Sequence, residues 1–347
     1  MLKESIPEID LLFTIDEYDT MWEKIAQYIN VQKKCDDLSY YDRIITTGPT
    51  TAYLKIAEGC SNNCTYCAIP YIRGKCKSRK IEDIVVEAKL LASEGIEELI
   101  IIAQDTTKYG IDIYKKPRLE DLLKKLCKIE EIKWIRLLYA NPASINDELI
   151  KLIKKQDKIC KYFDIPIQHI SNLVLKRMNR KGNEKNIKTL IKKIRKEIPE
   201  AILRTTIMVG FPGETEEDFT KLYNFVAETK FDKLGVFKYS KEEGTKAEQY
   251  ENQVHHRTKE SRFNRIMELQ NEISKEKLEE KVGKIFEVVI EQRTTSPKIF
   301  IGRTYMDTLE SDGVVYVKTN STKNIIGQFV KCKITNADEY DLIGEII

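Results

Sequence analysis

Six strand-like segments alternate with helix-like segments over the first three quarters of the chain. The apolar runs lie at 51–57, 97–103, 133–139, 161–167, 201–209 and 233–240. The stretches between them are amphipathic; in 81–95, for example, Ile84, Val85, Ala88 and Leu91 share one helical face. A strand, a helix and a further strand of the same sheet form a parallel unit with a right-handed crossover. Six strand–helix units in succession predict an α/β fold, in which a parallel sheet rolls into a full or partial TIM-like barrel.

The pattern changes from about residue 255. A long charged helical stretch at 257–283 leads into short apolar segments that are separated by turn residues. These segments lie at 284–292, 298–305, 313–320, 327–337 and 340–347. Five short strands of this kind predict a small antiparallel β-barrel. We therefore expect an α/β barrel over 51–280 and a β-barrel over 281–347, preceded by a fragment and linker at 1–50.

The charge balance and hydropathy of the chain exclude several classes of protein. Lys and Arg number 58 against 55 Asp and Glu, so the net charge of +3 is too small for a dedicated nucleic-acid binder. No apolar run approaches the length that spans a bilayer, and no secretory signal is visible. The sequence therefore predicts a soluble, cytoplasmic protein with no membrane contact.

Three of the eight cysteines are bunched in GCSNNCTYC (59–67), directly after the first predicted strand. The other five are scattered (Cys35, Cys76, Cys127, Cys160 and Cys332), which is typical of a reducing compartment. A structural zinc site needs four ligands, and Cys76 is the nearest fourth candidate. An iron–sulfur cluster with three protein ligands instead leaves one iron open to a small molecule. Because active sites of such barrels lie at the carboxyl ends of the strands, we expect Cys60, Cys64 and Cys67 at the barrel mouth.

The Cys-x3-Cys-x2-Cys loop, with Tyr66 before the last cysteine, resembles that of the radical S-adenosylmethionine superfamily. The resemblance implies that Cys60, Cys64 and Cys67 hold one 4Fe-4S cluster whose fourth iron chelates S-adenosylmethionine. It also implies that an electron cleaves the sulfonium and releases a 5′-deoxyadenosyl radical. A primary carbon radical attacks almost any C–H bond, so a dry barrel interior serves to contain it.

Longer segments narrow the resemblance to one family. Residues 53–79, residues 210–219 and the terminal barrel are similar to the methylthiotransferases, which insert sulfur into an unactivated C–H bond and methylate it. Residues 102–112, 166–180 and 302–317 resemble the branch called RimO, which modifies an aspartate of ribosomal protein S12. The resemblance implies a TRAM-type, OB-like terminal barrel for substrate docking, a reductant such as flavodoxin or ferredoxin, and a monomer. The tRNA-modifying branch, called MiaB, shares the cysteine loop and the GFPGE turn and is the alternative.

The first fifty residues depart from the family pattern. Methylthiotransferases resemble one another in an additional amino-terminal domain, whose three cysteines hold a second 4Fe-4S cluster. Residues 1–50 resemble a remnant of that domain just past its last cysteine, and Cys35 lies in a linker where the family has no ligand. We therefore expect a second cluster only in a longer form, with a mispredicted start or a truncated gene as the explanation. A chain that cleaves S-adenosylmethionine without transferring sulfur is a further alternative.

Four polar or aromatic residues are candidate cofactor-binding residues: Tyr66, Gln104, Gln168 and Arg204. Gln104 and Gln168 follow the second and fourth strands, where an amide can contact a cofactor or cap a loop. Arg204 lies in an apolar strand, so it needs a carboxylate partner, either the methionine end of the cofactor or an internal acid. No residue is assigned as a catalytic acid, base or nucleophile.

Two charged segments are candidate contacts with the ribosome. Residues 281–347 hold nine basic and nine acidic residues, and a neutral module is a poor tRNA binder. A surface carrying Asp307, Glu310 and Asp312 would meet a basic ribosomal protein with complementary charge. The run from Lys176 to Lys196 contains ten basic residues and one acid, Glu184. It is either a solvated helix face or a contact with ribosomal RNA.

Overall fold

The computed structural model describes residues 5–14, 17, 20–31 and 43–347. The chain forms two compact units, 1–46 and 47–347. The first unit contains helix α2 (Met21–Tyr28), and no residue of this helix is buried. Cys35 lies outside the described residues. The second unit contains both predicted barrels, and the predicted boundary near residue 280 falls between helix α11 (His256–Glu279) and strand β9 (Ile285–Arg293).

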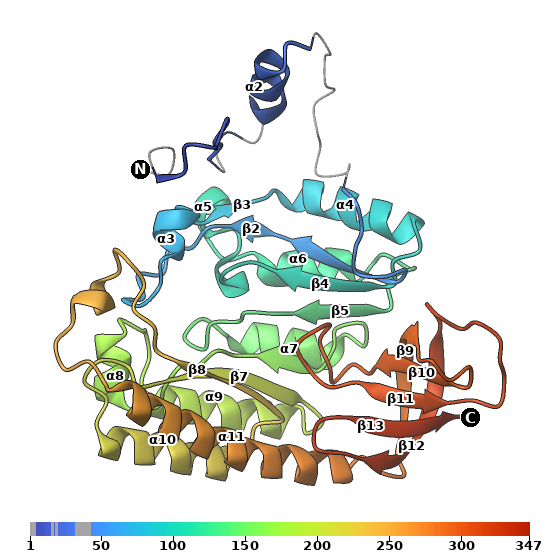
Figure 1. The fold of residues 1–347 in the computed structure, drawn as a ribbon. Helices are drawn as coiled ribbons and strands as arrows, with labels where there is room; N and C mark the ends of the chain where they lie inside the picture. The colour runs from blue at the N-terminus through green and yellow to red at the C-terminus, as the bar shows by residue number, and fades with distance from the viewer. Residues whose placement is uncertain (1–4, 15–16, 18–19, 32–42) are drawn as a thin grey trace. The chain divides into compact units, whose positions relative to one another are not determined.

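All six predicted strands of the α/β barrel are present. They are β1 (Thr51–Lys55), β4 (Glu98–Ile102), β5 (Trp134–Leu137), β6 (Tyr162–Asp164), β7 (Ile202–Val209) and β8 (Lys233–Lys238). They pair in parallel as two sheets, β1-β4-β5 and β6-β7-β8. An Ile135–Ile159 bridge and a hydrogen bond from Ala140 N to Asp164 O of 2.9 Å join the two sheets. The prediction of a partial barrel is therefore confirmed (Figure 1).

The helices that cover the strands also lie where the amphipathic pattern predicts them. They are α4 (Ile81–Ser93), α6 (Leu119–Leu126), α7 (Asp147–Lys155), α9 (Glu184–Glu197) and α10 (Glu216–Thr229). The shorter elements are β2 (Ala57–Glu58), α3 (Ile69–Ile72), β3 (Lys77–Ser78), η2 (Thr106–Lys108), α5 (Ile111–Tyr114), α8 (Asn172–Arg177) and η3 (Lys246–Gln249). Thr215 and Asp218 form a capping box that fixes the start of α10. Within the described ranges, no helix has the length and apolar character needed to cross a membrane.

The carboxyl-terminal residues form a closed five-stranded barrel. Its strands are β9, β10 (Ile299–Arg303), β11 (Val315–Lys318), β12 (Phe329–Ala337) and β13 (Leu342–Ile346), in the order β10-β11-β13-β12-β9. Four of the five pairings are antiparallel, and β11 pairs with β13 in parallel. Directions cannot alternate fully around a closed ring with an odd number of strands. One parallel pair is therefore a consequence of closing five strands.

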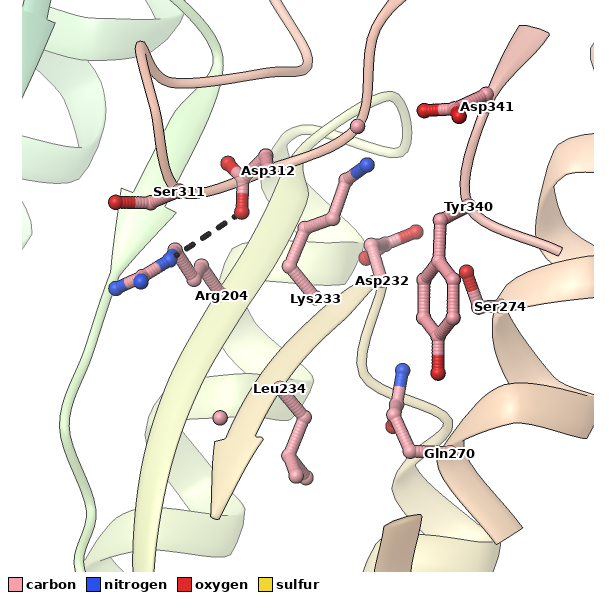
Figure 2. A pocket seen from close by; sticks show the side chains of 12 residues that line it. Arg204, Asp232, Lys233, Leu234, Gln270, Ser274, Ser311, Asp312, Tyr340 and Asp341 are labelled. Carbon is pink, nitrogen blue, oxygen red and sulfur yellow. Dashed lines mark ion pairs between the residues drawn. The ribbon is translucent and has the colours of Figure 1, made fainter. Parts of the chain in front are cut away.

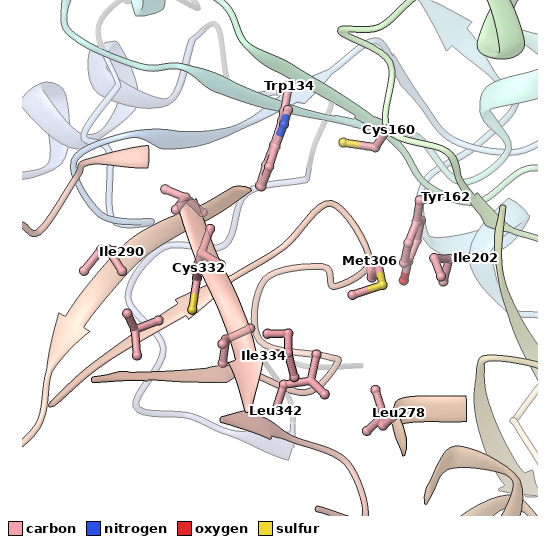
Figure 3. Packing of buried hydrophobic residues seen from close by; sticks show 14 of the residues in the cluster. Trp134, Cys160, Tyr162, Ile202, Leu278, Ile290, Met306, Cys332, Ile334 and Leu342 are labelled. Atoms are coloured by element: carbon pink, nitrogen blue, oxygen red, sulfur yellow. The ribbon is translucent and has the colours of Figure 1, made fainter. Parts of the chain in front are cut away.

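The two barrels of the second unit share one hydrophobic core, part of which is drawn in Figure 3. Trp134, Cys160, Tyr162 and Ile202 contribute from the parallel strands and their ends, while Phe300, Val317 and Cys332 contribute from the terminal barrel. The ring of Trp134 packs edge-on against Phe329 with a centroid distance of 4.8 Å. The terminal barrel is therefore fixed to the α/β barrel by packing.

A buried charge cluster lies at the same junction. Glu98, the first residue of β4, is fully buried and accepts from Arg136 Nε at 2.9 Å and Arg303 Nη2 at 2.6 Å. Thr51 Oγ1, at the start of β1, donates to the second carboxylate oxygen at 3.2 Å. Arg303 ends β10, so this cluster binds the terminal barrel to the amino ends of the parallel strands.

The acidic docking surface expected on the terminal barrel is wrong for two of its three residues. Asp307 forms an ion pair with Lys233 Nζ at 2.7 Å, and Asp312 pairs with Arg204 Nε at 3.4 Å. Their side chains are 6% and 3% exposed, whereas Glu310 is exposed. The fold places Arg204 of β7 and Lys233 of β8 next to this loop. Asp312 and Asp307 neutralise these two cations and are therefore not available at the surface.

Candidate active site

A cavity of about 580 Å³ lies at the carboxyl ends of the parallel strands. Its walls include every site residue predicted from the sequence: Cys60, Cys64, Tyr66, Cys67, Gln104, Gln168 and Arg204. These side chains come from the loop after β2, from the ends of β4 and β6, and from within β7. The arrangement follows from parallel strands, because their carboxyl ends meet at one edge.

The cysteine loop is held by the end of α8 and the residues that follow it. Thr65 N donates to Met178 O at 3.1 Å, Thr65 Oγ1 donates to Arg177 O at 2.9 Å, and Asn179 Nδ2 donates to Asn63 O at 2.7 Å. The start of the basic run, 176–180, therefore supports the cysteine loop rather than facing solvent throughout. Arg180 of this segment also lines the cavity and donates to Pro166 O at 2.5 Å.

The three cysteines are free and partly buried on the cavity wall. Burial raises the pKa of Cys60 and of Cys67, so these groups are thiols in the metal-free chain and lose their protons on binding metal. Among the residues with described positions, no three His, Cys, Asp or Glu side chains are arranged around a single metal ion. Three free thiols that share a cavity wall match the number of protein ligands expected from the sequence, and their binding of a cluster stays a prediction.

Gly59 sets the turn that leads into the cysteine loop. Its φ is +76°, a conformation that residues with a Cβ rarely adopt. A Cβ at this position would also collide with the carbonyl oxygens of Arg73, Gly74 and Lys75. The approach is this close because Cys60 N donates to Gly74 O at 3.1 Å and closes the loop.

Replacing Gly59 with alanine is expected to destabilise the cysteine loop and to lower the amount of iron that the chain retains. The control is Gly74→Ala, because Gly74 has φ +70° but a Cβ added to it would meet no atom of the described residues within 4 Å. The control should cost only the backbone strain of about 1–2 kcal/mol. Thermal unfolding and iron content measure both effects. Equal losses of thermal stability and of iron in the two variants would show that the close packing around Gly59 does not determine whether the cysteine loop holds iron.

Gln104 has an unused hydrogen-bond acceptor at the cavity. Its Nε2 donates to Glu58 Oε1 at 3.1 Å, whereas its Oε1 is buried and has no hydrogen-bond partner among the described residues. Burial opposes the ionisation of Glu58, but the hydrogen bond and charge of Lys55 outweigh it and lower the pKa of this carboxyl. An ionised Glu58 fixes which end of the Gln104 amide remains for a ligand.

Gln168 and Tyr66 are held firmly by their surroundings. The backbone of Gln168 has φ +68°, and it donates to Thr206 O at 2.8 Å and accepts from Met208 N at 2.7 Å. Such strained conformations persist where the surrounding structure imposes them, often at functional sites. The ring of Tyr66 packs edge-on against Phe211 with a centroid distance of 6.4 Å. Burial raises the pKa of its hydroxyl, so Tyr66 stays neutral.

Arg204 has the carboxylate partners that its burial required. Its Nη1 donates to Asp164 Oδ1 at 2.9 Å, and its Nε lies 3.4 Å from Asp312 Oδ1. Both partners are internal acids, which was one of the two predicted possibilities. The guanidinium still lines the cavity, so binding of the cofactor by Arg204 stays a prediction.

Sequence reasoning found only part of a polar hub beside the cysteine loop, because it indicates an N-cap or a loop brace at Asp105 and does not identify Asn62 or Asn141. Asp105 is buried and accepts from Asn62 Nδ2 at 2.7 Å and from Asn141 Nδ2 at 3.3 Å. It also caps η2 by accepting from Thr107 N. Asp105, Asn62 and Asn141 all line the cavity. An amide or acid directly after a predicted strand, as at Asp105 and Asn141, was the signal that could have identified them.

The GFPGE segment does not line the cavity, and Gly210 and Gly213 shape its turn with φ of +70° and +79°.

The chain is similar to known families over nearly its whole length. The radical SAM superfamily model matches residues 54–226, and the TRAM domain model matches residues 282–347. A relative from Alkaliphilus oremlandii, named ribosomal protein uS12 methylthiotransferase RimO, is 57% identical over 99% of this chain and 79% of its own length. Relatives of the same name from Clostridium botulinum strain Langeland and Clostridioides difficile are 51% and 49% identical, over 99% and 100% of this chain and 78% and 79% of their own lengths.

Solved structures with a similar arrangement are more distant. Coproporphyrinogen III oxidase (HemN) from Escherichia coli is 16% identical, with a TM-score of 0.47 over 84% of this chain and 67% of its own. The radical S-adenosylmethionine methyltransferase TsrM from Kitasatospora setae, with cobalamin and a [4Fe-4S] cluster bound, is 17% identical, with a TM-score of 0.46 over 59% of this chain and 41% of its own. The sequence relatives decide the assignment, and they confirm the branch predicted from the sequence. The chain belongs to the radical S-adenosylmethionine superfamily and, within it, to the RimO family of ribosomal protein uS12 methylthiotransferases.

Proposed function

We propose that this chain is a radical S-adenosylmethionine methylthiotransferase that replaces a hydrogen on the β-carbon of an aspartate in ribosomal protein uS12 with a methylthio group. The observation that carries the proposal is the cavity at the carboxyl ends of the strands, where three free thiols meet Gln104, Gln168 and Arg204. The names of relatives that are 49–57% identical over nearly the whole chain support the choice of substrate.

Cys60, Cys64 and Cys67 would hold one 4Fe-4S cluster. When bound, the cluster supplies the electron that cleaves a carbon–sulfur bond of S-adenosylmethionine and yields a carbon radical. The residues around the thiols fit these groups, because Gln104 Oε1 is a buried acceptor with no partner in the part of the chain that the structure describes, and Arg204 presents N–H donors at the same cavity. Tyr66 would form a fixed aromatic wall beside the cofactor.

The remaining walls of the cavity suit a reaction that must exclude water. Ile102, Ala103, Tyr139, Pro166 and Phe237 contribute apolar surface. Apolar walls keep solvent away from a reactive carbon, and a fixed Gln168 would orient the substrate against it. Tyr139 and Phe237 are 46% and 60% exposed, so the substrate would enter on their side.

The proposed substrate also indicates where the enzyme acts and which partners it needs. A protein that modifies a ribosomal protein acts in the cytoplasm, and we propose that it acts as a monomer with a one-electron reductant such as flavodoxin or ferredoxin. The terminal barrel would dock the substrate. Its formal charge of zero suits a protein partner better than the phosphate backbone of tRNA.

The test is to incubate the reconstituted chain with S-adenosylmethionine, dithionite, sulfide and purified uS12, and to measure the mass of uS12 together with 5′-deoxyadenosine. We expect deoxyadenosine and a mass gain of one methylthio group on an aspartate. Unchanged uS12 beside methylthiolated adenosine in bulk tRNA would overturn the choice of substrate. Deoxyadenosine with no sulfur on either substrate would indicate cleavage of the cofactor without sulfur transfer.

A further inference from the structure

An acid of the terminal barrel reaches the wall of the proposed active site. Asp312 lies in the connection between β10 and β11, and its side chain is 3% exposed. It lies 3.4 Å from Arg204 Nε, and it accepts from Tyr162 Oη at 2.6 Å and from Thr308 N at 2.9 Å. Figure 2 shows the pair with Arg204 beside a second cavity of about 280 Å³, which lies between β8, α11 and the terminal barrel. Arg204 lines both cavities.

The guanidinium of Arg204 is held on two of its three nitrogens. Asp164 accepts from Nη1 with one carboxylate oxygen and from Tyr139 N with the other, at 2.9 Å each. Asp312 faces Nε. For Nη2, the described residues provide no hydrogen-bond or ion-pair partner, and the Arg204 side chain is 20% exposed. Because a guanidinium is a rigid planar fork, fixing Nε and Nη1 also fixes the direction of Nη2.

Charge balance alone does not account for the second carboxylate. Asp164 is enough to neutralise one guanidinium. Burying a further carboxylate costs desolvation free energy, which its hydrogen bonds and ion pairs must offset. Asp312 has such contacts, but they join three separate elements, β6, β7 and its own loop. Beyond charge balance, Asp312 therefore helps to fix the orientation of the Arg204 guanidinium.

We propose that Asp312 is a positioning residue for the active site: it holds Arg204 so that the free N–H groups of the guanidinium face the cofactor cavity. The ligand of those N–H groups would be a carboxylate or carbonyl oxygen in that cavity. This inference rests on the proposed function, because it assigns Arg204 a role in binding S-adenosylmethionine. It also makes the terminal barrel part of the site's construction as well as a docking module.

The same loop contains a matched control. Asp307 is also nearly buried, forms an ion pair with Lys233 Nζ at 2.7 Å, and accepts from Thr304 Oγ1 at 3.0 Å. Lys233 lies at the amino end of β8 and does not line the cofactor cavity. Loss of either acid removes one buried ion pair between the barrels, but only the loss of Asp312 changes the surroundings of Arg204.

The experiment measures the equilibrium affinity of the cluster-loaded chain for S-adenosylmethionine without a reductant, so that binding is not followed by turnover. Asp312→Ala is expected to weaken binding about tenfold, the effect of one misplaced charge-assisted hydrogen bond. Asp307→Ala should stay within about twofold of the unsubstituted chain, although both variants lose thermal stability. In an Arg204→Lys background, Asp312→Ala should add no further loss, because the fork it orients is gone.

Three results would overturn the inference: unchanged affinity in Asp312→Ala, equal losses in the two acid variants, or full additivity with Arg204→Lys. If Asp312→Ala does not fold, Asp312→Asn keeps the side-chain volume and is measured in the same way. Failure of the unsubstituted, cluster-loaded chain to bind S-adenosylmethionine would overturn the proposed function itself, and so differs from failure of the inference.

Discussion

Replacing Cys64 with alanine is expected to lower the iron of the reconstituted chain from about four atoms to fewer than one and to abolish the formation of 5′-deoxyadenosine. Cys60, Cys64 and Cys67 share one cavity wall. A cluster with only three protein ligands has no spare ligand to lose. The same loss is expected for Cys60→Ala and Cys67→Ala. Iron analysis after anaerobic reconstitution, followed by chromatography of the nucleoside product, measures both quantities.

Cys127→Ala is the control for this experiment. Cys127 is partly buried at the carboxyl cap of α6 and does not line the cavity. Removing its thiol should leave the iron content and deoxyadenosine formation unchanged. Iron that persists at the unsubstituted level in Cys64→Ala would show that the cluster ligands lie elsewhere. About eight iron atoms in the unsubstituted chain would show a second cluster site.

The parallel strands and the site at their ends could be predicted from the sequence because the signals are local. A short apolar run, here of seven to nine residues, that lies between turn residues indicates a buried strand without reference to distant parts of the chain. Once the strands are placed, their parallel direction brings the residues that follow them to one edge. Gln104, Gln168 and the three cysteines were found by this rule, and the structure places all of them on one cavity.

The fate of the acidic loop could not be predicted in the same way. Asp307 and Asp312 stand among turn residues, and acids in such a segment are usually exposed. Their burial depends on Lys233 and Arg204, which are 74 and 108 positions away in the chain (307 − 233 and 312 − 204). A partner that distant leaves no mark on the local pattern. The parallel pairing of β11 with β13 likewise depends on closure of the barrel as a whole.

At the junction of the barrels, the buried carboxylate of Glu98 neutralises two buried arginines, so the stability of the junction depends strongly on its charge. Arg136 and Arg303 are also buried, and one carboxylate serves both. Arg303 has a further partner in Glu291 at 2.7 Å, whereas Arg136 otherwise donates to the carbonyl oxygens of Tyr305 and Thr304. Burial opposes the ionisation of Glu98, but the charges and hydrogen bonds of Arg303 and Arg136 outweigh it. They lower the pKa of Glu98 to about 2 from its ordinary value of 4.5.

Replacing Glu98 with glutamine is expected to lower the free energy of unfolding at pH 7 by about 3–5 kcal/mol, because it leaves buried guanidiniums without their counter-charge. The adjacent Glu97 is the control: it pairs with Lys133 at 2.6 Å but is 27% exposed, so Glu97→Gln should cost less than about 1 kcal/mol. The effect also has a defined pH dependence. The pKa of Glu98 is lower in the folded chain than in the unfolded chain. The stabilisation that ionised Glu98 gives the folded chain is therefore complete above about pH 5 and is lost as the pH falls towards 2. Urea unfolding should therefore show the gap between the unsubstituted chain and Glu98→Gln narrowing from pH 7 to pH 3. A gap that stays constant over this range would mean that the charge of Glu98 does not hold the two barrels together.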